Sequence, residues 1–316
     1  MKKQAVIVSL VLFFVAVSGA GIQPVSAEQV FISIGTGGTG GTYFPTGGAV
    51  ADLITRECPS VKSATAEVTA ASVENAKLVN SGDTDMGLVA WVSIVGDELT
   101  DKLPNLRTLW WIHGSDRQWI VPAESPIKSP RDFKGKKVVV GAPASATEVT
   151  SRLELEFFGL TYKDFTPAYL SFSEGVEALK DGRVDVALVM AGFPNASVTD
   201  VATLRKIRVL DYSQEDLKAL EEKYPFCPPV VIPAGTYPGQ DKDVHTFTTP
   251  GPMVINKDVP EQVAYEIVKA VHTNHENLAK NSHKAFGRWR FDPSIGKLAP
   301  LHPGAERYYK EIGKLK

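Results

Sequence analysis

The sequence predicts an α/β protein of two lobes, each with a mostly parallel sheet covered by helices, and a ligand cleft between the lobes. Three observations predict this class. Apolar strands alternate with amphipathic helices, which is typical of parallel sheets. One arrangement of strand, small-residue turn and helix occurs twice. A stretch with strand character lies between the two copies, and further helices follow the second.

Length and composition exclude several other classes. The chain has 316 residues, of which 43% are hydrophobic and 22% charged, and its formal net charge is −2. This composition does not fit a disordered tail, a coiled coil or a small disulfide-stabilised protein. The near-neutral charge argues against a nucleic-acid partner, because phosphate contacts require a basic excess.

Residues 1–27 have the three parts of a secretory signal. Lys2 and Lys3 precede an apolar stretch, Ala5 to Val17, and small residues stand before a cleavage point at about Ala27. An N-terminal anchor or a buried helix is the alternative, but the apolar stretch is shorter than the roughly 20 residues that span a bilayer. We therefore expect an exported protein whose mature form lies in the periplasm.

The first repeat unit begins with an alternating strand over residues 30–34 and a glycine-rich turn over 35–43. A helix follows, with Val50, Leu53 and Ile54 on its apolar face. Next come a strand at 64–68, a helix from Ser72 to Gly82, and a buried strand at 86–89, with Ser72 expected to be the N-cap of its helix.

The second unit repeats this order, with its turn at residues 141–147. Ser145 with Glu148, and Ser171 with Glu174, match the S-x-x-E capping box that starts a helix. The strands of this unit are expected at residues 137–140, 168–170 and 186–189.

The two units correspond most closely in the motif G-x-x-D-x-x-L-V, which starts at Gly82 and again at Gly182. In both, a helix ends at glycine, a turn carries an aspartate, and an apolar strand begins. Chance similarity of two common α/β units is the alternative. We interpret the pattern as one unit for each lobe.

The lobes require crossing segments. A strand that includes residues 118–121 is expected to cross between them, and a second crossing near the strand at 244–247 returns the helices at 260–279 and 308–312 to the first lobe. We therefore assign residues 28–120 and 246–316 to lobe I, and residues 121–245 to lobe II.

The two turns predict an anion site. Helix N-termini carry unpaired N–H groups and a partial positive charge, so they hold phosphate or carboxylate without lysine or arginine. Thr39, Thr42, Ser145 and Thr147 add hydroxyl donors. The alternative is that the glycines make tight turns and the hydroxyls cap helices.

Other readings of the motifs are weaker. G-x-G-x-x-G at Gly35 lacks the acidic partner of a dinucleotide site, and no lysine follows to make a phosphate loop. There is no G-x-S-x-G elbow. His272 and His275 are expected to lie on a solvated helix face rather than to bind metal. Cys58 and Cys227 are expected to be separate, partly buried thiols, with a disulfide as the alternative.

Trp91 and Phe193 follow equivalent strands of the two units. Open α/β sheets bind ligands at the carboxyl ends of their strands. We therefore take both aromatic residues, with Gly192, as candidates for the cleft, although packing is the alternative role.

Several motifs resemble those of the TAXI solute receptors of TRAP transporters. The glycine-rich turn extends to Pro45 as GTGGTGGTYFP, and the resemblance continues through the segments ASVEN at 71–75, GDTDMG at 82–87, GAPASATE at 141–148 and PAGTYPGQ at 233–240. It covers almost the whole mature chain. It implies a type II periplasmic-binding-protein fold that closes over its ligand and then docks on a membrane permease.

The resemblance also implies ligand classes and site residues. Glutamate-like amino acids and dicarboxylates or keto acids are ligands of the family. Two departures are that Ala146 stands where the family usually has glycine and Trp91 where it often has a polar residue. With the candidates above, the ligand-binding residues are expected to be Thr39, Gly40, Thr42, Tyr43, Ala71, Ser72, Glu74, Trp91, Ser145, Ala146, Thr147, Gly192 and Phe193.

The sequence therefore predicts an extracytoplasmic solute-binding protein that delivers a small organic anion to a TRAP-type permease. We expect no enzyme activity, cofactor or metal, and a monomeric protein. An exported enzyme on a related two-lobed scaffold is the alternative, but the sequence shows no nucleophile–base pair for it. An adhesive surface protein without a transport role is a further alternative.

Overall fold

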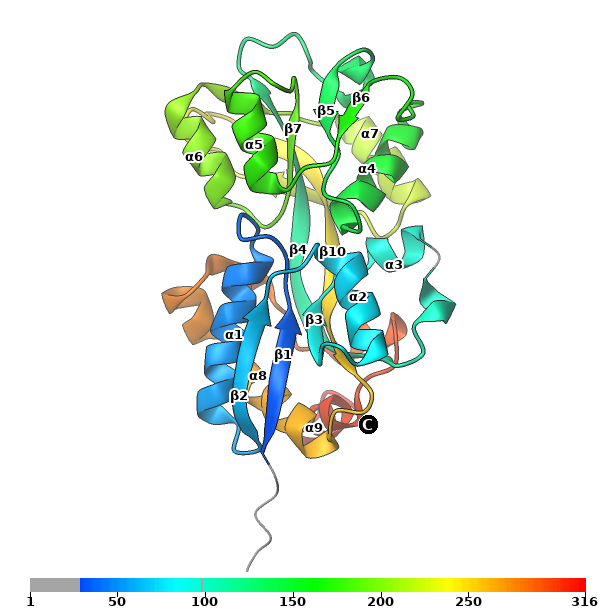
Figure 1. Ribbon diagram of the computed structural model, residues 1–316, viewed down its shortest axis with the longest axis vertical. Helices are drawn as coiled ribbons and strands as arrows, with labels where there is room; N and C mark the ends of the chain where they lie inside the picture. The colour runs from blue at the N-terminus through cyan, green and yellow to red at the C-terminus, as the bar shows by residue number, and fades with distance from the viewer. Residues whose placement is uncertain (1–28, 98) are drawn as a thin grey trace, which may run out of the picture.

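The computed structural model describes residues 29–97 and 99–316, and the predicted signal segment at 1–27 lies outside them. Two halves lie one above the other in Figure 1, connected by two long strands, β4 and β10. The described residues contain no helix that is both long and apolar enough to cross a bilayer.

Lobe I contains the first repeat unit. Strand β1 (Val30–Gly35) lies between β2 (Val61–Glu67) and β3 (Met86–Leu88) and is parallel to both. Helix α1 (Tyr43–Glu57) connects β1 with β2, and helix α2 (Ser72–Ser81) connects β2 with β3. Since all three strands end at the same edge, both helices begin there.

Lobe II contains the second unit in the same arrangement. Strand β5 (Lys137–Val139) is parallel to β6 (Thr166–Ala168), and a parallel bridge from Val138 to Val186 joins it to the start of β7 (Ala187–Met190). Helices α4 (Ala146–Phe157) and α5 (Phe172–Lys180) connect these strands. The capping box predicted for Ser171 and Glu174 is confirmed at the start of α5.

The aspartate of the shared motif makes the same hydrogen bond in both units. Asp85 accepts a hydrogen bond from the backbone N–H of Ser33 at 2.8 Å, and Asp185 accepts one from the N–H of Lys137 at 2.8 Å. Each carboxylate therefore ties the start of the third strand to the first strand of its unit. The glycine before each aspartate has a left-handed backbone, with φ of 83° at Gly82 and 70° at Gly182.

Two long antiparallel strands connect the lobes. Strand β4 (Leu106–Pro122) pairs with β7 and β8 (Ile207–Val209), and β10 (Val244–Asn256) pairs with β3 in lobe I and β9 (Pro229–Ile232) in lobe II. Their mutual register shifts between Thr249 and Gly251, near the crossing. Both strands are longer than the short segments expected from the sequence.

Each lobe has its own hydrophobic core. The lobe II core is drawn from residues 119–247, and the lobe I core from residues 32–112 and 253–309. The described Cys58 and Cys227 lie in different cores as free thiols, as expected.

The remaining elements cover the sheets. Helices α8 (Glu261–Asn281) and α9 (Pro303–Glu311) pack against each other, and α8 packs on α1, so the C-terminal segment completes lobe I (Figure 1). The other helices are α3 (Val92–Gly96), α6 (Ala196–Leu204) and α7 (Gln214–Lys223), with short 3₁₀ turns at Thr100–Lys102, Pro130–Phe133, Lys284–Arg288 and Pro293–Lys297.

Candidate functional site

Two adjoining cavities lie where the lobes meet. The one we call the inner cavity has a volume of about 50 Å³ and is lined by Gly37, Gly38, Gly41, Thr42, Tyr43, Ala71, Ser72, Ser115, Ala146, Thr147, Phe172, Met190 and Ala191. The outer cavity, about 260 Å³, shares part of this lining and adds Thr39, Gly40, Val68, Thr69, Ala70, Ala142, Ser145, Ser171 and Ser173. Both repeat units therefore contribute to one hollow.

Most of the residues predicted for the site line these cavities. They are Thr39, Gly40, Thr42, Tyr43, Ala71, Ser72, Ser145, Ala146 and Thr147. The other four, Glu74, Trp91, Gly192 and Phe193, are not among the lining residues, and their contacts are described below.

Four helices begin at the inner cavity. Their first residues, Tyr43, Ser72, Ala146 and Phe172, all belong to its lining, and each lobe supplies two of them. Each helix start presents backbone N–H groups and the positive end of a helix dipole. Their convergence makes the cavity electropositive without a cationic side chain, which suits an anionic group.

The helix starts of lobe I are uncapped, whereas those of lobe II are capped. Thr42 and Ala71 precede α1 and α2, and neither side chain accepts a hydrogen bond from the first helical turn. Ser145 and Ser171 each accept one from the N–H three residues further on. The N–H groups at the start of α1 and α2 are therefore the better placed to bind a ligand.

Two predictions about helix caps need correction. Ser72 is the first residue of α2 rather than its N-cap, and its hydroxyl accepts a hydrogen bond from the Ala90 N–H at 3.0 Å, beyond the end of β3. The box at Ser145 is only half formed. Ser145 caps α4, but the Glu148 carboxylate accepts a hydrogen bond from the Tyr162 hydroxyl at 2.9 Å, because that tertiary partner competes with the local one.

Ala71 has a strained backbone at the edge of both cavities. Its φ of 77° and ψ of −141° fall in a region that favours glycine, which costs about 1–3 kcal/mol. Hydrogen bonds from three neighbours hold this conformation. The Ala71 N–H donates to Thr69 Oγ1 at 3.0 Å, and the Ala71 carbonyl accepts from the Asn75 N–H at 2.8 Å. The Glu74 carboxylate accepts from the N–H of the preceding residue, Ala70, at 2.5 Å. Glu74 therefore braces this loop and lies outside the cavity lining.

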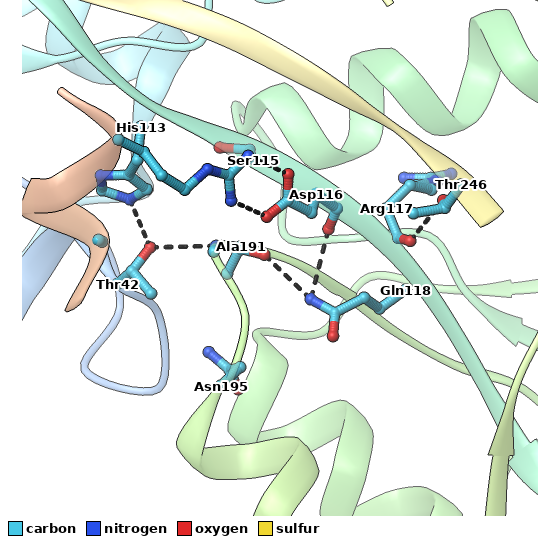
Figure 2. A network of polar contacts seen from close by, with 12 residues as sticks. Thr42, His113, Ser115, Asp116, Arg117, Gln118, Ala191, Asn195 and Thr246 are labelled. Carbon is cyan, nitrogen blue, oxygen red and sulfur yellow. Dashed lines mark hydrogen bonds and ion pairs between the residues drawn. The ribbon is translucent and has the colours of Figure 1, made fainter. Parts of the chain in front are cut away.

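A buried histidine fixes the hydroxyl of Thr42 (Figure 2). His113 Nε2 lies 2.7 Å from Thr42 Oγ1, and the Trp289 indole N–H donates to His113 Nδ1 at 2.9 Å. Since the indole can only donate, His113 Nδ1 must accept, and the ring proton is on Nε2. The imidazole therefore donates to Thr42, whose oxygen also accepts from the Gly192 N–H at 3.4 Å.

This pair cannot serve as a nucleophile and its base. A base would need an unprotonated Nε2 facing the hydroxyl, which is the opposite tautomer. Burial, with the nearby positive charges of Arg288 and His283, also lowers the pKa of His113 to about 3. A neutral His113 in this tautomer orients Thr42 without activating it.

An ion pair lies behind the cavity. Asp116 on β4 is fully buried, and Arg288 donates to both of its oxygens, at 2.5 and 2.8 Å. Burial raises the pKa of Asp116, and the Arg288 guanidinium opposes that effect. The guanidinium also lies over the Phe193 ring, 5.2 Å from its centroid. Phe193 therefore packs against Arg288 and is not among the lining residues of either cavity.

A second polar chain connects β4 to lobe II. Gln118 donates to the Ala191 carbonyl at 2.9 Å and accepts a hydrogen bond from the Tyr237 hydroxyl (Figure 2 shows Gln118 below β4). Tyr237 in turn accepts from the Asn195 N–H at 3.1 Å. The motif at 233–240 thus brings a tyrosine into contact with β4 and with the start of α6.

A buried ion pair also lies within lobe II. Arg117 Nε is 2.6 Å from Glu154 Oε2, and the guanidinium donates to Ser151 Oγ at 2.9 Å. Glu154 also accepts from the Trp119 indole at 2.8 Å and from the Tyr212 hydroxyl. Both charges are satisfied inside α4 and its neighbours, so neither is free for a ligand.

The lobes touch on two sides of the cavities. The Gly40 carbonyl of lobe I accepts from Asn195 Nδ2 at 3.0 Å and from Ser197 Oγ at 3.4 Å. Elsewhere Arg152 of α4 pairs with Asp97, which follows α3, at 2.7 Å. These contacts are those of a closed arrangement of the lobes.

Trp91 packs inside lobe I. It lies in an apolar cluster with Ala76, Val79, Leu103 and Val254, and it lines a separate cavity beside the segment around Pro300. The described lining residues of the inner and outer cavities do not include it.

The cavity lining lacks charge. Over residues 29–97 and 99–316, no lysine, arginine, aspartate, glutamate or histidine lines the inner or the outer cavity. In the same ranges no group of three potential metal ligands comes together. The arrangement is therefore suited to binding through backbone and hydroxyl groups.

Sequence reasoning missed the polar stretch of β4, which includes His113, Ser115, Asp116, Arg117 and Gln118. A signal was present, since these polar residues interrupt a strand bounded by Trp110-Trp111-Ile112 and Trp119-Ile120-Val121. All five are buried. Buried polar side chains require partners, so such a run predicts a network.

Comparison with solved structures shows the fold. The alkanesulfonate-binding protein SsuA from Xanthomonas axonopodis pv. citri, bound to MOPS, aligns with a TM-score of 0.53 and 15% identity over 90% of this chain and 84% of that chain. A putative L-cystine ABC transporter protein from Listeria monocytogenes aligns with a TM-score of 0.51 and 14% identity, over 81% of this chain and 96% of that chain. A Xanthomonas citri protein bound to ATP aligns with a TM-score of 0.50 and 12% identity, over 89% of this chain and 99% of that chain.

The α/β architecture with a cleft between two lobes is thus that of periplasmic binding proteins. The sequence profile of the NMT1-like family matches residues 34–313, which include both lobes and every residue that lines the two cavities. The chain belongs to the NMT1-like family.

Proposed function

We propose that this protein is a solute-binding protein that captures a small organic anion between its lobes and delivers it to a membrane transporter. The convergence of four helix starts on one inter-lobe cavity carries the proposal. The family match and the binding-protein fold support the same class. The anion binds to the N–H groups of α1 and α2 and to the hydroxyls of Thr42, Ser72 and Thr147.

Closure of the lobes is part of the proposed mechanism. Ligand in the inner cavity contacts residues from both lobes, so binding favours the closed arrangement over an open one. The carbonyl of Gly40, held by Asn195 and Ser197, and the ion pair of Asp97 with Arg152 stabilise the closed form. Binding to the folded protein alone stabilises it by mass action.

Ligand release from the purified protein tests capture directly. Denaturation followed by mass spectrometry identifies any anion that co-purifies, and a thermal-shift panel of carboxylates, sulfonates, amino acids and phosphates measures stabilisation. We expect at least one organic anion to raise the Tm and to show 1:1 binding in calorimetry. If no anion in a broad panel binds, the proposal is wrong.

The proposed site of action is the periplasm. The secretory pattern of residues 1–27 supports export, and the segments shared with TAXI receptors favour a TRAP permease as the partner. The structural neighbours from ABC systems support only the fold of the receptor.

Uptake experiments distinguish the two transporter classes. In whole cells, uptake of the identified anion is measured with an uncoupler that collapses the ion gradient and, separately, with ATP depleted while the gradient is maintained. A TRAP partner predicts loss of uptake in the first condition and retention in the second. The reverse result assigns the receptor to an ATP-driven system.

A further inference from the structure

We propose that the cleft selects a small organic monoanion whose head carries only hydrogen-bond acceptors and whose body is uncharged, such as a 2-oxo acid, a simple alkanoate or an alkanesulfonate. This inference rests on the proposed function and narrows it. It departs from the amino acid and dicarboxylate ligands implied by the TAXI resemblance. Three features of the described residues support it: the direction of the hydroxyl groups, the pairing of the nearby charges, and the apolar wall.

The Thr42 hydroxyl can only donate to a ligand. Its oxygen accepts from His113 Nε2–H at 2.7 Å and from the Gly192 N–H at 3.4 Å, which uses both lone pairs. Trp289 holds His113 in the tautomer that makes this donation. The remaining hydroxyl hydrogen has no further partner in the described part of the chain and belongs to a residue of the cavity lining. An ammonium group at this point would meet another donor.

Two further hydroxyls of the lining also accept hydrogen bonds from backbone N–H groups. Ser72 accepts from the Ala90 N–H at 3.0 Å, so its hydroxyl hydrogen is directed away from that contact, and it stands in the uncapped first turn of α2. Ser145 already donates to the Ala142 carbonyl at 2.6 Å and accepts from the Glu148 N–H. Thr42 and Ser72 are therefore left to donate to a ligand, beside the uncapped N–H groups of α1 and α2.

The charged groups beside the cavities are already engaged. The Glu74 carboxylate accepts a hydrogen bond from the Ala70 N–H, and the Glu174 carboxylate accepts two from Ser171. Arg117 binds Glu154 at 2.6 Å, and Asp116 binds Arg288 through both oxygens. Among the described lining residues there is no carboxylate to receive an ammonium group and no cation for a second carboxylate. An α-amino acid would leave a buried ammonium unpaired, and a dicarboxylate would leave one anionic end without a cationic partner.

The wall of the inner cavity suits an apolar body. Tyr43, Phe172 and Met190 form its larger side chains, with Ala146 and Ala191 between them. Its enclosed space of about 50 Å³ limits the ligand to a small molecule. The methyl group of Ala146, where the TAXI family usually has glycine, adds apolar surface at the start of α4.

Matched ligand pairs test the selection. Calorimetry compares 3-methyl-2-oxobutanoate with L-valine, pentanoate with glutarate, and pentanoate with butane-1-sulfonate. We expect the 2-oxo acid and the monocarboxylate to bind at least about tenfold tighter than the amino acid and the dicarboxylate, as expected when a buried charge loses its partner. The comparison of pentanoate with butane-1-sulfonate shows whether the site prefers a carboxylate or a sulfonate group. Tighter binding of either compound is consistent with the inference.

The outcomes separate this inference from the proposed function. If L-valine or glutarate, or L-glutamate as a family reference, binds as tightly as the matched monoanions, the selection is wrong while anion capture stands. If none of these compounds binds while another anion of the broad panel does, the selection is wrong and capture stands; if no anion of the broad panel binds, both are wrong.

Two variants test the role of the hydroxyl hydrogen. Thr42→Val keeps the shape of the side chain but removes the donor, and Thr42→Ser keeps the donor. We expect Thr42→Val to weaken binding of the tightest monoanion at least about tenfold, and Thr42→Ser to weaken it less than about threefold. Thermal unfolding without ligand verifies that both variants fold. Equal affinity of Thr42→Val and the parent protein overturns the assignment of Thr42 as the selecting donor.

Discussion

Asn195 of lobe II donates its side-chain amide to the carbonyl of Gly40 in lobe I, at 3.0 Å. The same side chain accepts from the Ser197 N–H and so caps α6. One residue therefore joins the start of a lobe II helix to the glycine-rich turn of lobe I. The contact exists only where the two lobes meet, which makes it a local marker of the closed arrangement.

Asn195→Asp separates the two roles of this residue. Aspartate caps a helix as well as asparagine, but it cannot donate to the Gly40 carbonyl. We expect ligand affinity to fall about tenfold, while the free energy of unfolding without ligand changes by less than about 0.5 kcal/mol. Calorimetry with the co-purified anion and chemical denaturation measure the two quantities. Unchanged affinity would show that this contact does not stabilise closure.

Gly40→Ala should block closure by direct contact. A Cβ at this position lies 2.2 Å from Ser173 Oγ and 2.9 Å from Ser197 Oγ, both in lobe II. We expect affinity to fall at least about tenfold, because both hydroxyls must move away and the Ser173 backbone N, 3.3 Å from the added Cβ, leaves little room in the closed arrangement. Small-angle scattering with saturating ligand should then show a larger radius of gyration than for the parent protein.

Gly48→Ala is the matched control for this variant. Gly48 lies in α1, and a Cβ there meets no heavy atom within 4 Å. We expect unchanged affinity and a gain of about 0.5–1 kcal/mol in unfolding free energy from helix propensity. If both variants lose affinity equally, steric blocking at Gly40 is not the cause.

His113 should make stability depend on pH. Burial, followed by the charges of Arg288 and His283, lowers its pKa from 6.5 to about 3. Between these values the unfolded chain binds a proton that the folded protein does not, so stability is complete above pH 6.5 and falls as the pH is lowered. The slope from this group is about 1.4 kcal/mol per pH unit.

His113→Asn isolates this contribution, since its side-chain carbonyl can accept from the Trp289 indole and it does not titrate. We expect denaturant unfolding between pH 6.5 and 4.5 to show a shallower loss of stability in the variant than in the parent. The burial of His302, which also lowers its pKa, contributes equally to both proteins. Identical slopes would mean that His113 is not held neutral by the fold.

The ion pair of Asp116 with Arg288 should be strongly coupled. Arg288→Met leaves a fully buried carboxylate without its partner, which we expect to cost about 3–5 kcal/mol of unfolding free energy. The double variant Asp116→Asn with Arg288→Met removes the buried charge and should recover part of that loss. Chemical denaturation of all four proteins gives the coupling energy, and additive effects would contradict a paired role.

The two thiols should be inert in the folded protein. Burial, with the nearby Glu266 and Glu57 carboxylates, raises the pKa of Cys58 to about 12, and burial, with Glu154, raises that of Cys227 to about 12. We expect a thiol reagent at pH 8 to label neither in the native state and both in denaturant without reductant. Labelling of neither in denaturant would indicate a disulfide.

Much of the fold follows from local sequence. Glycine at positions 82 and 182 supplies the left-handed residue that ends each helix, and the aspartate three residues later ties the next strand to the first strand of its unit. Short-range patterns of this kind depend on backbone conformation and helix periodicity, so they can be read in a single chain. The glycine-rich turn likewise indicated a helix start suited to an anion.

Only the tertiary structure decided which helix starts share a cavity and which groups are left for a ligand. Ser72 looks like a helix cap in sequence, but the Ala90 N–H reaches its hydroxyl from the end of β3. Trp91 follows a strand end, yet it packs into the apolar cluster of lobe I. The direction of the Thr42 hydroxyl depends on His113 and Trp289, which are distant in sequence. Periodicity identifies elements, whereas partners brought together by folding determine the hydrogen-bonding state of each side chain.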